Sequence, residues 1–92
     1  MTNELNAFHI EDYLKTDTDI REFLKEVAEN GSTDDFMHAL NTAARAKGMT
    51  HIAKQAGVTR ASLYKSLAEN SHPRFDTINK VVEALGCKLI IA

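Results

Sequence analysis

Candidate helix ends recur along this chain at short intervals, and they constrain its fold more than any other feature. Gly31, Gly48, Gly57 and Gly86 each follow a segment whose apolar residues repeat with helical spacing. Glycine can adopt the left-handed conformation that closes a helix, so each glycine is a candidate helix end. The pattern predicts a series of short helices and an all-α fold.

Two capping patterns predict helix starts in the N-terminal half. Thr16 is followed by Asp19 and Ser32 by Asp35, so that the two side chains of each pair can bond free backbone N–H groups. Residues 10–14 are expected to form a short helical turn docked on the body. The expected buried stripes are Ile20, Phe23, Leu24, Val27 and Ala28 in the first helix, and Phe36, Leu40, Ala43 and Ala44 in the second.

Two shorter helices are expected after Gly48. Thr50 is a candidate cap for a helix that runs through Ala56, and Thr59 is a candidate cap for a helix from Arg60 to about Glu69. Residues 49–69 therefore form one unit of the expected organisation, after the N-terminal helices at 1–48. Together with a last helix at 74–86, these make five helices in a single domain of residues 1–92. The expected buried face of the last helix is Phe75, Ile78, Val81, Val82 and Leu85.

The tail, residues 87–92, reads CKLIIA and differs in character from the helices. It is apolar and partly β-branched, which predicts a short β-strand. A single strand leaves its backbone groups unpaired, so we expect it to pair between chains in a two-fold homodimer.

The charge of the chain is divided unevenly between its halves. Residues 1–46 hold ten acids and four bases, a net charge of −6, whereas residues 47–92 hold three acids and seven bases, a net charge of +4. The basic half suits phosphate and the acidic half suits a basic partner. Ordinary solvated faces are the alternative interpretation.

Composition argues against several functional classes. Cys87 is the only cysteine, which excludes an internal disulfide and suits a reducing cytoplasm. The start of the chain does not resemble a signal peptide, and no run is long enough to span a membrane. We expect no cofactor, no metal and no catalytic residues, because neither a metal-ligand spacing nor a nucleophile arrangement is present. The four histidines are scattered, at His9, His38, His51 and His72.

The segment AKQAGVTRASLYKSL, residues 53–67, carries the most specific pattern. Two short helices that cross at a large angle need a small residue at their contact and a glycine at the turn, which are the roles of Ala53 and Gly57. Leu63 faces the core, and Tyr64 either shields the core or lies toward a nucleic-acid backbone, with the core favoured. The exposed face of the second helix would be Thr59, Arg60, Ala61, Ser62 and Lys65.

This pattern resembles the lambda-repressor-like helix-turn-helix family, also called the Xre family, over residues 36–86. One departure is Ser66, which stands where that family usually has an apolar residue, and we expect Leu67 to take over the packing. The resemblance implies a DNA-reading helix set in the major groove. Its candidate DNA-binding residues are Thr50, Thr59, Arg60, Ala61, Ser62, Lys65, His72 and Arg74.

A closer resemblance covers almost the whole chain. The stretches EDYLKT, ARAKGMTHIAKQAGVTRASLYKSL, HPRFDTINKVVEALG and CKLIIA are similar to the HigA-like addiction-module antidote proteins. That resemblance implies an antitoxin of a type II toxin–antitoxin module. It would neutralise a small RelE/ParE-like (HigB-type) toxin and repress its own operon. From the charge split we expect the toxin to be basic, and from the two-fold dimer we expect the double-stranded DNA site to be an inverted repeat. The alternatives are a transcriptional regulator of the same fold without a toxin, and an interaction module that has lost DNA binding.

Overall fold

The computed structural model describes residues 10–91, while residues 1–9 and 92 lie outside the described part of the chain. Within it, a 3-10 helix, η1 (Ile10–Tyr13), leads into five α-helices. These are α2 (Asp17–Asn30), α3 (Thr33–Lys47), α4 (Met49–Ala56), α5 (Arg60–Ser66) and α6 (Phe75–Ala84). The all-α prediction is therefore confirmed for the described residues.

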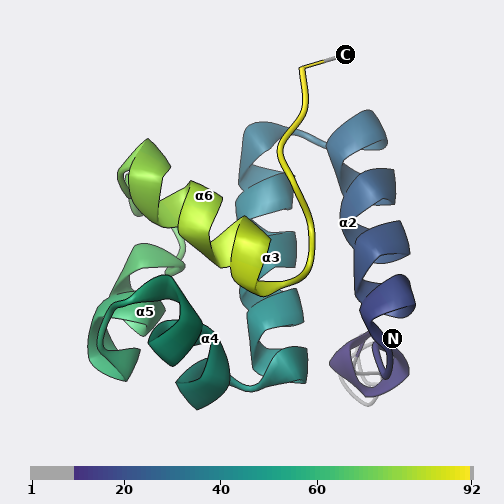
Figure 1. The fold of residues 1–92 in the computed structure, drawn as a ribbon. Coiled ribbons are helices and arrows are strands. Elements are labelled where there is room, and N and C mark those ends of the chain that lie inside the picture. The colour runs from purple at the N-terminus through teal and green to yellow at the C-terminus, as the bar shows by residue number, and fades with distance from the viewer. Residues whose placement is uncertain (1–9, 92) are drawn as a thin grey trace, which may run out of the picture.

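Helices α2 and α3 form an antiparallel hairpin on one side of the molecule, while α4, α5 and α6 lie on the other side (Figure 1). Helix α4 packs against α3, α5 and α6, so it joins the two sides. A single core runs through the domain, and its largest fully buried side chains are Ile20, Leu40, Ile52, Leu63, Val81 and Leu85.

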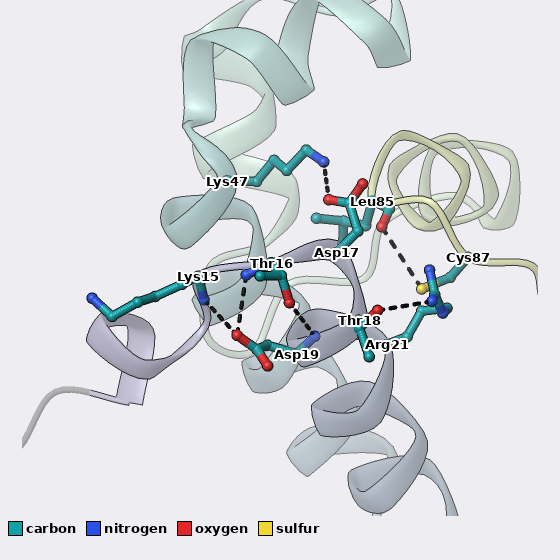
Figure 2. A network of polar contacts seen from close by, with 9 residues as sticks. All are labelled: Lys15, Thr16, Asp17, Thr18, Asp19, Arg21, Lys47, Leu85 and Cys87. Atoms are coloured by element: carbon teal, nitrogen blue, oxygen red, sulfur yellow. Dashed lines mark hydrogen bonds and ion pairs between the residues drawn. The ribbon is translucent and has the colours of Figure 1, made fainter.

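Both capping boxes form as the sequence predicts. Thr16 Oγ1 accepts a bond from the Asp19 backbone N at 3.0 Å, and Asp19 Oδ2 accepts one from the Thr16 N at 3.1 Å (Figure 2). Ser32 and Asp35 repeat this exchange at 3.1 and 2.9 Å. These local bonds fix the start of α2 and the turn into α3, and thereby the hairpin.

Figure 2 also shows one polar contact between the two helices of the hairpin, Lys47 to Asp17, and one within the C-terminal segment, Cys87 to the Leu85 carbonyl. Lys47, the last residue of α3, is hydrogen-bonded to Asp17 at the start of α2, and this bond lowers the pKa of the Asp17 carboxyl. Cys87 packs against the core, and its burial raises the pKa of the thiol. The thiol is therefore held in its protonated, less reactive form.

The predicted C-terminal strand is wrong. Residues 87–91 adopt no strand, and neither does any other part of the chain from 10 to 91. Ile90 and Ile91 are 77% and 101% exposed, and no neighbouring strand lies beside them to receive their backbone bonds. A β-branched composition favours a strand only where another strand can pair with it.

Two other expectations about the C-terminal half are wrong. Phe75, predicted to lie on the buried face of α6, is 72% exposed, because it is the first residue of that helix and extends beyond the core. Helix α5 ends at Ser66 rather than near Glu69, since the Ser71 hydroxyl donates to the Ser66 carbonyl at 2.7 Å and Asn70 takes a φ of 65°. The chain turns there instead of continuing the helix.

The Asp19 cap predicts a specific pH dependence of stability. The backbone N–H groups of Lys15 and Thr16 bond its carboxylate and lower its pKa below the ordinary 3.8. A carboxyl whose pKa is lower in the folded state stabilises the fold above its unfolded-state pKa, and that contribution is lost as the pH falls through the folded-state value. We expect Asp19→Ala to lower the free energy of unfolding most above about pH 5 and progressively less below about pH 4.

Urea denaturation of the wild type and Asp19→Ala at a series of pH values checks this expectation. Glu22→Ala, which removes an exposed carboxylate from the same helix, is the matched control. A stability difference for Asp19→Ala that stays constant from neutral to strongly acidic pH would contradict the assigned role of the carboxylate.

Candidate nucleic-acid interface

Helices α4 and α5 are joined by a tight turn at Gly57. This glycine takes a left-handed conformation with φ of 73° and ψ of 29°, as expected for a helix-closing residue. The Val58 N–H donates to the Ala53 carbonyl at 3.0 Å, which satisfies the end of α4. Ala53 is 3% exposed, so the small residue and the glycine occupy the positions that the sequence predicts for them.

Helix α5 is attached to the core through one side of its surface. Leu63 is fully buried, and it is the only buried residue within the helix. Leu67, which follows the helix, is 2% exposed, so the expectation that it takes over the packing role from Ser66 is confirmed. The rest of α5 is left free to face outward.

The DNA-facing surface that the sequence predicts on and before the second helix, called the α5 face from here on, is exposed along its whole length. Thr59 lies at the N-cap position, where its Oγ1 accepts a bond from the Ser62 N at 3.0 Å. Its hydroxyl hydrogen is still available as a donor. The exposed residues of the face are Thr59, Arg60, Ala61, Ser62 and Lys65.

Arg60 bridges the two helices. Its Nη1 donates to Thr50 Oγ1 at 2.9 Å, and its Nη2 donates to the Tyr64 hydroxyl at 3.2 Å. The guanidinium carbon lies 5.4 Å from the centroid of the Tyr64 ring, a cation–π distance. Because a guanidinium carries five N–H donors, the remaining donors can still bond an external acceptor.

Thr50 and Tyr64 differ from their predicted roles. Thr50 does not cap α4: the helix begins at Met49, directly after Gly48, and the Thr50 hydroxyl serves Arg60 instead. Tyr64 is 42% exposed and does not shield the core. Its contact with Arg60 was missed at the sequence level, although the spacing of four residues places the two side chains on one helix face.

His72 and Arg74 lie in the connection between α5 and α6. Both side chains are exposed, and Arg74 holds the N-cap position of α6 without a capping bond from its side chain. Within residues 10–91, no side-chain hydrogen bond or ion pair joins either of them to Arg60 or to its partners Thr50 and Tyr64. The structure therefore brings together Thr50, Arg60 and Tyr64, while His72 and Arg74 are each exposed in the connection before α6.

Positive charge on the α4–α5 pair is not compensated. Residues 48–68 contain Lys54, Arg60 and Lys65 but no Asp or Glu. Among residues 10–91, the ion pairs involve Arg45, Lys47 and Lys80, and none involves the three cations of the α4–α5 pair. An exposed, unpaired cationic surface of this kind attracts phosphate.

No metal or membrane feature was found in the described residues. Residues 10–91 contain no group of three or more His, Cys, Asp or Glu side chains placed to hold a metal ion. None of the described helices is long and apolar enough to cross a bilayer.

The fold and this surface define a small all-helical domain with an exposed, basic pair of short helices. Comparison with known proteins gives the family. A family model described as "Probable addiction module antidote protein" matches residues 4–92, and the chain belongs to that family. Membership gives the chain the role of an antitoxin and implies a toxin as its partner.

One relative illustrates the extent of the match. An uncharacterized protein of Haemophilus influenzae is 35% identical over 86 residues, which span 94% of this chain and 89% of that protein. No solved structure matches the chain.

Proposed function

We propose that this antitoxin represses its own operon by binding an inverted-repeat DNA through α4 and α5, which act as a helix-turn-helix of the HigA-like, Xre class. The uncompensated positive charge of residues 48–68 is the single observation that carries the proposal. Phosphate contacts fix such a domain on the duplex, while side chains on the second helix reach base edges.

The residues divide between these two tasks. Arg60 is the candidate for a bidentate contact with guanine, since its fork matches two acceptors on one base. Ala61 and Ser62 are short, which allows the helix to approach the groove floor. Lys65 and Lys54 supply phosphate contacts, and His72 and Arg74 extend the contact surface next to α6.

The toxin that we propose as partner is a small basic protein of the RelE/ParE-like, HigB type. Net charges of −6 in residues 1–46 and +4 in residues 47–92 support separate surfaces for the toxin and for DNA. We also propose that the chain has no catalytic activity and acts as a homodimer, because an inverted repeat requires two recognition helices related by a two-fold axis.

Fluorescence anisotropy with a labelled duplex from upstream of the gene tests the DNA-binding proposal. We expect the logarithm of the binding constant to fall linearly with the logarithm of the salt concentration, because neutralised phosphates release counterions. A duplex of the same composition in which the inverted repeat is scrambled should bind more weakly. Equal affinity for both duplexes would contradict sequence-specific repression.

The neighbouring reading frame separates the proposal from a regulator without a toxin. We expect its product to be a short basic protein that co-purifies with this chain and arrests growth when it is expressed alone. Suppose that the chain binds the duplex, but the neighbouring product neither binds the chain nor arrests growth. The regulator without a toxin is then the better assignment.

A further inference from the structure

A groove lies between η1, α2 and α3, and its lining includes no residue of the basic α4–α5 pair. Its volume is about 510 Å³. Phe23 and Val27 of α2, Ala39 of α3 and Ile10 of η1 supply its apolar lining. Ile10 is 41% exposed, and Phe23 and Val27 are half-buried, so part of the apolar lining is open to solvent. An open apolar groove of this size can receive side chains from another molecule.

The rim of the groove is acidic. Glu26 of α2 and Asp35 of α3 line it, and the lining includes no lysine or arginine. Asn30 holds the Glu26 side chain in place, since its amide nitrogen donates to Glu26 Oε2 at 2.9 Å. The groove therefore combines an apolar surface with fixed negative charge.

The position of this charge along α2 is unfavourable for the isolated chain. The C-terminal end of a helix carries partial negative charge, which favours cations and disfavours carboxylates. The last turn of α2 has no basic residue, and both Glu26 and Glu29 lie near its C-terminal end. A cation bound at the groove would relieve this repulsion, whereas the phosphates of DNA would increase it.

We infer that this groove is the docking site for the toxin and receives a segment of it with apolar side chains flanked by lysine or arginine. The inference rests on the proposed pairing with a basic toxin. The groove and the face of α5 are lined by different residues, so the same chain can hold toxin and DNA on separate surfaces.

A titration of the purified product of the neighbouring reading frame against the full-length chain tests the inference. Glu26→Lys reverses a rim charge, and we expect it to weaken binding about tenfold. Ile10→Ser removes exposed apolar contact from the groove and should weaken binding about threefold to tenfold. Glu83→Lys, which makes the same change of charge on an exposed residue of α6, is the matched control and should leave the dissociation constant within about twofold.

Both groove variants are expected to fold, because Glu26 and Ile10 are exposed. Thermal melting of each variant checks this, and DNA binding by the same samples should be unchanged. Unchanged toxin affinity in folded Glu26→Lys and Ile10→Ser, beside tight binding by the wild type, would overturn the groove assignment and leave the antitoxin proposal standing.

Two other outcomes also have defined meanings. If the wild-type chain does not bind the neighbouring product at all, the pairing proposed above fails rather than the groove assignment alone. If the groove variants dissociate a dimer in sedimentation while toxin affinity is kept, the occupant is a second copy of this chain and the inference is wrong.

Discussion

Arg60→Ala is expected to weaken binding of the upstream duplex by about 10- to 100-fold, because loss of a bidentate base contact costs about 1–3 kcal/mol. Arg60 is the only residue of the α5 face whose side chain is held from two directions, by Thr50 and by Tyr64. Fluorescence anisotropy at fixed salt measures the effect. The loss should be greatest on the natural duplex and smaller on scrambled DNA, because a base contact contributes mainly to specificity.

Arg60→Lys separates charge from geometry. Lysine keeps the positive charge but lacks the fork, so it should restore only a minor part of the affinity. Lys65→Ala provides a contrast on the same helix: loss of a phosphate contact should weaken binding to all sequences alike and reduce the salt slope by about one. Lys25→Ala, an exposed lysine on α2, is the control for net charge.

Loss of the bridge between α4 and α5 is a competing explanation for weaker DNA binding by Arg60→Ala, and Thr50→Val tests it. This variant removes the hydroxyl that accepts from Arg60 but keeps the base-reading guanidinium. If Arg60 acted only by holding α4 against α5, Thr50→Val would weaken binding as much as Arg60→Ala. We expect a loss of a few-fold at most, because an exposed hydrogen bond of this kind contributes about 1 kcal/mol or less.

Local chemistry explains which parts of the fold were predictable from the sequence. The starts of α2 and α3 depend on side chains only three residues from the backbone groups that they bond, so Thr16 and Ser32 were sufficient to locate them. The turn at Gly57 depends on the conformation of that residue alone. In each case the determining interaction is contained within a few residues of sequence.

The features that were mispredicted depend on neighbours that the local sequence does not specify. Residues 87–91 have the composition of a strand but no second strand beside them. Thr50 has the chemistry of a cap, yet Gly48 has φ of 113° and is the single residue between the end of α3 and the start of α4. Tyr64 is apolar enough for a core position but faces Arg60 on the surface.

The two candidate surfaces also differ in whether the local sequence could predict them. The face of α5 could be predicted from residues 59–65, because one buried residue, Leu63, fixes which side of a short helix points outward. The groove between α2 and α3 could not be predicted. Its lining comes from three elements, and its shape depends on how their side chains pack. The sequence indicated only that this half of the chain is acidic.

Of the substitutions proposed here, Leu63→Ala is expected to cause the largest loss of stability. Leu63 is fully buried and is the only residue within α5 that anchors the helix in the core. Truncation of a buried leucine costs about 2–5 kcal/mol, through lost burial and the cavity that remains. A domain of this size loses about 4–8 °C of Tm for each kcal/mol of lost stability, so the expected fall in Tm is roughly 10–40 °C.

Thermal and urea denaturation measure this loss, and Leu89→Ala is the matched control. Leu89 is 38% exposed, so the same substitution there should cost well under 1 kcal/mol. Equal destabilisation by the two variants would show that Leu63 does not anchor α5. Below its Tm, Leu63→Ala should also bind the upstream duplex more weakly although every residue of the α5 face is kept, because a recognition helix contributes affinity only while the core holds its orientation.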